Sequence, residues 1–127
     1  MVRKIKLEER IAYFAYEGCV EIRDLETFIG WLEEFEAELP YSPDRFSDLS
    51  QVTRFELSYT SLDLFAQTRG PGILKNPVRS AIVAPQPLHF GYTRMYATIM
   101  QDPRVTIQIF ADAADALAWL QAAPARS

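Results

Sequence analysis

The sequence has little of the chemistry that metal sites and catalytic sets need, because its 127 residues include one cysteine and one histidine. Cys19 has no second cysteine with which to form an intramolecular disulfide, and Cys19 and His89 together cannot build a cysteine- or histidine-rich metal site. Ser-His-Asp and Cys-His catalytic sets are excluded unless they are built around His89. We interpret Cys19, in an apolar stretch, as a small buried hydrophobic residue rather than a reactive thiol. We expect no metal, no cofactor and no enzymatic activity.

Long hydrophobic runs and glycine-rich loops are also missing. The basic residues at the amino terminus have no apolar run behind them, which argues against a signal peptide, and no segment has the ~20 apolar residues of a membrane helix. Gly70 and Gly72 lack the lysine of a P-loop and the spacing of a dinucleotide-binding loop, so we interpret them as turn residues. We therefore expect no membrane span and a cytoplasmic location.

The charge that is present is unevenly distributed around a net value of -4. The segment from Asp24 to Leu39 carries acidic residues and no lysine or arginine, whereas the segment from Arg69 to Arg104 is basic with a single acid, Asp102. The acidic segment argues against nucleic-acid binding, and the basic segment is able to hold one anion. We nevertheless interpret both segments as solvated surface in preference to binding sites.

Hydrophobic periodicity predicts an α/β domain. Apolar stretches predict strands over 3–7, 11–17, 45–49, 78–84 and 105–109, with the second strand ended by Gly18. Stripes at helical spacing predict helices after an Asp24 N-cap, over 58–68 with Ser58 or Thr60 as cap, from Leu88 to Ile99, and after an Asp112 cap with Ala113, Leu117 and Leu120 facing inward. The order β-β-α-β-α-β-α-β-α predicts a mostly parallel sheet of four to five strands with about four helices. We expect one domain over 1–122 and a flexible tail over 123–127.

Candidate binding residues gather where this order places the carboxyl ends of parallel strands. Asp48 and Ser50 follow a predicted strand, and hydroxyls come soon after it, although capping and turn formation also explain them. The later basic residues are able to meet a carboxylate or phosphate, and His89 is either an anion-binding or a structural histidine. The candidate rim consists of Asp48, Ser50, Ser58, Thr60, Ser61, Lys75, Arg79, His89 and Arg94.

Several phrases of the sequence carry a resemblance to a known family. They are 13–18 (Tyr-Phe-Ala-Tyr-Glu-Gly), 46–52 (Phe-Ser-Asp-Leu-Ser-Gln-Val), 79–84, 91–96 and 109–120. Together with the order of elements, they resemble the SpoIIAA-like group within the STAS fold, whose namesakes are bacterial anti-sigma factor antagonists. The resemblance implies a regulatory or protein-interaction module with a protein partner or self-association. Trp31 lies beside the apolar stripe of the helix after Asp24, and an exposed tryptophan there would suit an interface.

The resemblance also implies where a regulatory serine would lie. In regulatory STAS domains an Asp-Leu-Ser-like strand end leads to Asp-Ser-Ser-Gly, whose serine is phosphorylated. Here the second motif falls on Glu56–Tyr59, which places Leu57 at the acceptor position and Tyr59 at the glycine position, with Ser58 one residue away. We therefore expect a module without the serine switch. The alternatives are a carrier of a small apolar or anionic, lipid-like ligand and an enzyme that uses Asp48 and His89.

Overall fold

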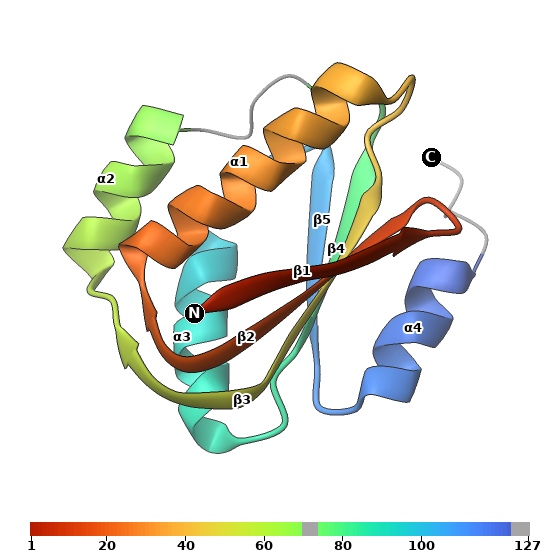
Figure 1. The fold of residues 1–127 in the computed structure, drawn as a ribbon. Helices are drawn as coiled ribbons and strands as arrows, with labels where there is room; N and C mark the ends of the chain where they lie inside the picture. The colour runs from red at the N-terminus through yellow and green to blue at the C-terminus, as the bar shows by residue number, and fades with distance from the viewer. Residues whose placement is uncertain (70–73, 123–127) are drawn as a thin grey trace.

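A computed structural model describes residues 1–69 and 74–122, and in these residues five strands form one sheet in the order β1-β2-β3-β4-β5 (Figure 1). The first pair is antiparallel and the later pairs are parallel. The predicted order of elements is confirmed, while residues 70–73 of the predicted loop and the predicted tail lie outside the described residues. The strands are β1 (Val2–Glu8), β2 (Ile11–Glu21), β3 (Asp44–Glu56), β4 (Val78–Val83) and β5 (Val105–Phe110). The helices are α1 (Ile22–Glu38), α2 (Tyr59–Arg69), α3 (Pro87–Ile99) and α4 (Ala113–Gln121).

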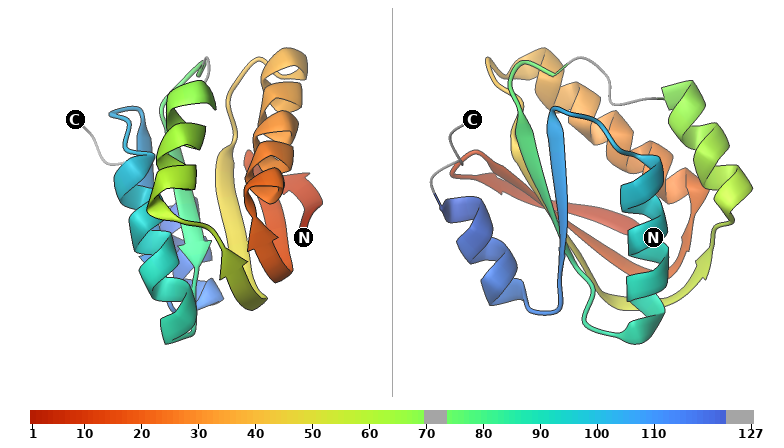
Figure 2. Two further views of the ribbon diagram at one scale, coloured as in Figure 1. Left: turned by 90° about the vertical axis from the view of Figure 1, so that its left-hand side faces the viewer. Right: turned by 180° about the vertical axis from the view of Figure 1, so that it is seen from behind.

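The helices divide between the two faces of the sheet in the way the strand order requires. Each of the crossovers through α1, α2 and α3 leads to the next strand in the same direction. Because such crossovers are right-handed, their helices lie on the same face. Figures 1 and 2 show α1, α2 and α3 on one side of the sheet and α4 alone on the other. None of the helices in the described ranges is long and apolar enough to cross a membrane.

The core has two parts, one on each face of the sheet. The larger cluster joins α1, α2 and α3 to β2 and β3, and the smaller one joins α4 to the middle strands. Alternate residues of β3 serve the two clusters, since Ser47 and Leu49 face α1 and α3 whereas Phe46 packs on the α4 side. This alternation fixes which side chains of β3 reach the interior beneath α1 and α3.

The strands β2 and β3 are longer than predicted. Strand β2 continues through Gly18, which adopts a φ of +66° beside a shift in the pairing register, so glycine bends this strand instead of ending it. Strand β3 continues past Asp48 to Glu56 because its second half stays paired with the second half of β2. Figure 1 shows both strands curving strongly over these residues.

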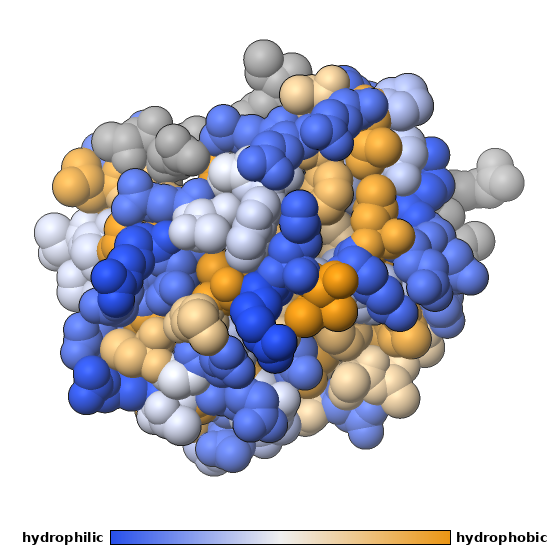
Figure 3. Space-filling view, in the orientation of Figure 1, coloured by the Kyte–Doolittle hydropathy of each residue, from blue (hydrophilic) through white to orange (hydrophobic). Residues whose placement is uncertain are grey.

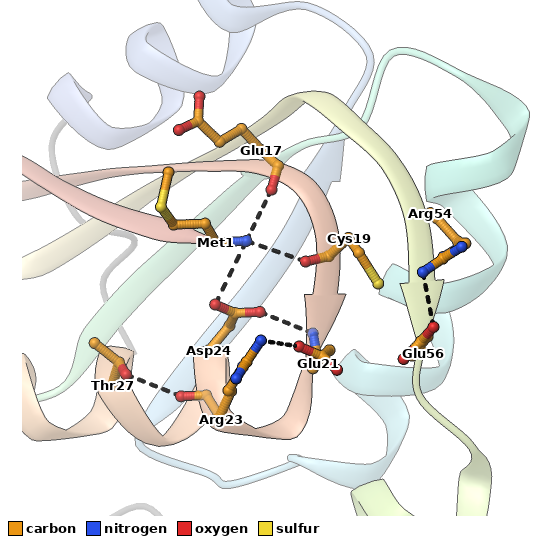
Figure 4. Close-up of polar contacts among 9 residues, drawn as sticks. All are labelled: Met1, Glu17, Cys19, Glu21, Arg23, Asp24, Thr27, Arg54 and Glu56. Atoms are coloured by element: carbon orange, nitrogen blue, oxygen red, sulfur yellow. Dashed lines mark hydrogen bonds and ion pairs between the residues drawn. The ribbon is translucent and has the colours of Figure 1, made fainter.

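The start of α1 differs from the prediction. The N-cap is Glu21 and not Asp24, which lies in the first turn and accepts a hydrogen bond of 2.8 Å from the Glu21 N–H (Figure 4). The Asp24 carboxylate also lies 3.5 Å from the Met1 amine, which donates to the carbonyls of Glu17 and Cys19. Further along α1, Trp31 is half-buried and stacks on Phe14 with 5.9 Å between ring centroids.

The other predicted caps are confirmed. The Ser58 hydroxyl accepts a hydrogen bond of 3.0 Å from the Ser61 N–H at the start of α2. Asp112 accepts from the N–H groups of Ala114 and Asp115 at the start of α4. The inward face of α4 was predicted wrongly at one position: Ala116 and Leu120 are buried, whereas Ala113 is exposed.

Candidate functional site

A cavity of about 50 Å³ lies between the sheet and helices α1 and α3. Much of its wall is hydrocarbon from Leu25 and Phe28 of α1, Leu49 and Phe55 of β3, and Ile82 of β4. Protein interiors are packed as densely as organic crystals, and one water takes only ~10–15 Å³ by the same measure. The space is therefore large enough for a small group of atoms rather than a packing defect.

Hydroxyl-bearing side chains from four elements are among the residues that line this cavity. Ser47 of β3 and Ser80 of β4 lie on adjacent strands, and Tyr16 of β2 and Tyr96 of α3 lie in the same wall. The two serines are almost fully buried, and their small side chains leave the space that larger residues would fill. None of the hydrogen bonds found among residues 1–69 and 74–122 uses any of these four hydroxyls. The four hydroxyls thus have no hydrogen-bond partner in the described part of the chain.

A buried guanidinium lies beside this wall, although Arg45 is not itself one of the residues that line the cavity. Arg45 is 8% exposed, occupies the same face of β3 as Ser47, and lies opposite Ser80 in the pairing of β3 with β4. Within the described part of the chain its Nε has no hydrogen-bond partner and its guanidinium forms no ion pair within 4.0 Å. Burying polar or charged groups is unfavourable unless they are paired, so Arg45 is an exceptional feature of the interior.

The electrostatics of the cavity follow from burial. Burial lowers the pKa of the Arg45 guanidinium, an effect that Tyr96, Glu36 and Asp44 oppose, and arginine stays protonated in proteins. Burial also raises the pKa of the Tyr16 and Tyr96 phenols, which Arg45 opposes, so both phenols are neutral at physiological pH and able to donate hydrogen bonds. One cation beside neutral donors forms a site for a hydrogen-bond acceptor.

The two carboxylates that act on the pKa of Arg45, Glu36 and Asp44, bind groups other than Arg45. Glu36 accepts a hydrogen bond from the Ser42 hydroxyl, and Asp44 accepts one of 2.8 Å from the Arg79 N–H. Both act on Arg45 only over a longer distance. The described residues contain no group of His, Cys, Asp and Glu that could hold a metal ion.

Three residues of the predicted rim bind backbone carbonyls elsewhere. The Lys75 ammonium donates to the carbonyls of Glu36 and Leu39 at the end of α1. The Arg79 guanidinium donates to carbonyls at the end of α4, those of Trp119 and Leu120 at 2.7 Å and that of Ala122 at 3.1 Å. His89 is fully buried, with its Nε2 2.8 Å from the Val52 carbonyl oxygen. These contacts fasten helices and strands to one another.

The acidic and hydroxyl members of the predicted rim also lie apart. Asp48 is in the middle of β3 and not beyond a strand end, and it accepts a hydrogen bond of 2.9 Å from the Ser50 N–H. It lies on the α4 face, opposite Val83, whereas His89 is on the other side of the sheet, so the structure does not join them. Ser58 and Ser61 bind each other at the start of α2.

The two remaining members of the rim are exposed. Thr60 lies in the first turn of α2, and Arg94 lies on α3 with its guanidinium 5.5 Å from the centre of the Phe90 ring. The structure thus does not bring the nine residues together on one rim. A role of any of them in binding stays a prediction.

The residues around the cavity were missed because each has an ordinary explanation in the sequence. Tyr16 and Tyr96 fit a core strand and an apolar stripe, and Arg45 fits the start of a strand. A signal for Arg45 was present, since the predicted strand 45–49 is central and an arginine at its first position shares a face with Ser47 and Leu49. Charged residues are rarely fully buried, so one at a covered position points to a function.

Comparison with known proteins places the fold. No protein-family model matches the chain, and neither does any curated protein. The structure is similar to the crystal structure of an uncharacterised protein of the DUF3478 family with a SpoIIAA-like fold from Shewanella loihica PV-4. The two chains are 19% identical, superpose with a TM-score of 0.59, and match over 94% of this chain and 92% of the other. The chain has a SpoIIAA-like α/β fold, as the resemblance implied.

Proposed function

We propose that the chain is a non-enzymatic binding module that holds a small, largely apolar ligand in the cavity beneath α1 and α3. The observation that carries this proposal is the combination of a hydrocarbon wall with hydroxyls that no internal hydrogen bond uses. Ligand sites are mostly apolar with a few convergent polar groups that fix orientation. The cavity has this composition in an interior that is otherwise closely packed.

A binding role fits better than a catalytic one because the histidine is committed elsewhere. The Nε2 of His89 contacts the Val52 carbonyl, and its Nδ1 lies 3.4 Å from the Gln86 N–H. A general base must lie within hydrogen-bond reach of the group that it deprotonates. Both ring nitrogens of the single histidine are already occupied by backbone groups, so His89 does not serve the hydroxyls of the cavity.

A regulatory role is supported by the position of Leu57. This residue, at the acceptor position of the serine switch, is half-buried and lines both the cavity and a surface groove. Ser58 beside it is committed as the cap of α2. Because Leu57 borders both spaces, we propose that a bound ligand changes the groove. We propose that such a regulator is bacterial, as the resemblance implies, and that it acts in the cytoplasm.

Protein binding at this groove is a second candidate function. The groove has a volume of about 380 Å³ and lies between the start of α2 and helix α3. Two of its lining residues, Tyr59 and Leu88, are 62% and 45% exposed, and exposed apolar patches of this kind mark interaction sites. On the face that Figure 3 shows, by contrast, hydrophobic residues form small islands separated by hydrophilic ones.

The ligand proposal is tested by methyl NMR of the full chain titrated with hexanoate, hexanamide and hexanol. Binding in the cavity is expected to shift the methyl signals of Leu25, Leu49 and Ile82, which line it, and to leave Leu120 on the α4 face unchanged. In Ser80→Val the added methyl groups occupy part of the cavity and are expected to abolish the shifts. The matched control is Thr106→Val, at an exposed position of β5. Absence of shifts with all three compounds would refute the proposal.

The protein-binding candidate is tested with Leu88→Asp, which places a charge in the groove. Light scattering of the wild type detects self-association, and affinity capture detects other partners. Association at the groove is expected to be lost in Leu88→Asp and retained in Ala113→Asp, an exposed position on the opposite face. Equal association of both variants would exclude the groove as the interface.

A further inference from the structure

Two arginines of the adjacent strands β3 and β4 differ in the partners that the chain offers them. Arg79 is partly buried, but its guanidinium donates to three carbonyls and lies 3.6 Å from the Asp44 carboxylate. Arg45 is more deeply buried, and the described residues offer its guanidinium neither a hydrogen bond nor an ion pair. A buried cation with no partner is strongly unfavourable. A hydrogen-bond acceptor or anion from outside the chain would supply the partner that the Arg45 guanidinium lacks among the described residues.

The groups around Arg45 define what that partner would be. Ser80 is directly opposite Arg45 across the β3–β4 pair, Ser47 is on the same face two residues along, and the phenols of Tyr16 and Tyr96 feel the charge of Arg45. These four residues line the cavity, and Arg45 lies beyond its wall next to them. Guanidinium and neutral hydroxyls both donate hydrogen bonds, and a carboxylate accepts several at once, two of them from one guanidinium.

We propose that the ligand of the cavity is a short-chain monocarboxylate whose carboxylate pairs with Arg45 while its hydrocarbon part lies among Leu25, Phe28 and Ile82. This inference rests on the proposed function and specifies its ligand class. A single guanidinium balances one negative charge, which favours a carboxylate over a phosphate dianion. The volume of about 50 Å³ equals about three to five water-sized groups, which corresponds to the hydrocarbon part of an acid of roughly four to six carbons, with the carboxylate at the wall beside Arg45.

The experiment compares an acid with its neutral counterpart of the same shape. Calorimetry measures the binding of butanoate, hexanoate, butanamide and hexanamide to the full wild-type chain. We expect each acid to bind at least about tenfold more tightly than its amide, because only the acid pairs with the buried guanidinium. In Arg45→Met the acid is expected to fall to the affinity of the amide. Arg54→Met removes an exposed arginine from the same strand and is expected to retain the preference.

The outcomes separate this inference from the proposal on which it rests. Equal affinity of acid and amide in the wild type would overturn the monocarboxylate and leave the cavity as a binding site. Binding of neither, together with unchanged cavity methyl signals, would overturn both. If Arg45→Met does not fold, Tyr96→Phe takes its place. Loss of one phenol donor is expected to lower the affinity for the acid several-fold more than the affinity for the amide. An equal loss of affinity for both compounds would contradict the inference.

Discussion

At the scale of single residues, Arg45 presents a conflict between stability and binding. Its guanidinium lies where β3 is covered by helices, beside serines in place of the larger residues that would close the core. The buried guanidinium and the small serines both lower the stability of the fold, since a desolvated charge and unfilled space are unfavourable. Residues that lower stability in this way occur at functional sites, where activity requires them.

Arg45→Met is therefore expected to stabilise the ligand-free protein. Methionine keeps most of the length of the side chain and removes the buried charge, and apolar replacement of buried charges is often stabilising by about 1–4 kcal/mol. Urea unfolding followed by circular dichroism measures the free energy of unfolding. Arg54→Met, at an exposed position, is expected to change it by less than about 0.5 kcal/mol. A loss of more than about 1 kcal/mol in Arg45→Met would mean that the guanidinium is stabilised inside the folded chain.

His89→Ala is expected to lower the free energy of unfolding by about 3 kcal/mol. The substitution removes a fully buried ring that contacts Phe55 edge-on, and it leaves the Val52 carbonyl without its partner. The control is Gln108→Ala on the exposed side of β5, which is expected to be nearly neutral. A change of less than about 1 kcal/mol in His89→Ala would argue against the structural role and reopen a binding role for the histidine.

Individual residues were the hardest part to predict from the sequence. Ser58 and Asp112 were recognised as caps because capping depends on the residue type and its immediate neighbours. The neighbour of Arg45 on the next strand, and the carbonyls that the Arg79 guanidinium and His89 contact, come from segments more than thirty residues away. Local patterns in the sequence carry no information about such contacts. The candidate rim was consequently dispersed, and the cavity was not foreseen.

At the scale of elements, the order of strands and helices was predictable while the ends of β2 and β3 were not. Periodicity of apolar residues distinguishes strands from helices, as the confirmed β5 and α4 illustrate. The second half of β3 is polar at Gln51, Thr53 and Arg54 and does not read as a buried strand. This half of β3 is extended because its backbone pairs with the second half of β2. Such pairing is a tertiary effect that the local sequence does not encode.

Gly18→Ala and Gly30→Ala form a matched pair that tests the bend in β2. No atom lies within 4 Å of an added methyl group at either position, but only Gly18 has a positive φ. Alanine at Gly18 is expected to cost about 1 kcal/mol, because a side chain disfavours this backbone conformation. Alanine at Gly30, inside α1, is expected to stabilise by about 0.5–1 kcal/mol. Urea unfolding measures both, and equal effects would contradict the assigned strain.

Arg79→Met is expected to loosen α4 selectively. The guanidinium holds the last carbonyls of this helix and compensates the partial negative charge of its carboxyl end. Its loss is expected to cost about 2 kcal/mol and to speed amide hydrogen exchange in α4 more than in α1. Arg104→Met, in the exposed turn before β5, serves as the control. Uniform exchange across both helices would show that Arg79 supports the whole domain instead of one helix.

At the scale of the whole molecule, topology explains both what the sequence could predict and what it could not. A sequential order of parallel strands with right-handed crossovers places α1, α2 and α3 on one face, which follows from the order of elements alone. The space left beneath α1 and α3 depends on how the side chains of three strands and two helices fit together. Small differences in that fit separate a packed core from a binding cavity.

Ligand binding in such a cavity couples directly to global stability, because the site exists only in the folded chain. At a ligand concentration of about 100 times the dissociation constant, hexanoate is expected to raise the free energy of unfolding by about 2.7 kcal/mol. The increase is expected in the wild type and in Thr106→Val, and it is expected to disappear in Ser80→Val, whose added methyl groups occupy part of the cavity. Urea titrations with and without hexanoate measure it. An equal increase in the free energy of unfolding of Ser80→Val would mean that hexanoate binds elsewhere on the molecule. A ligand stabilises the folded chain only through a site that it can still occupy.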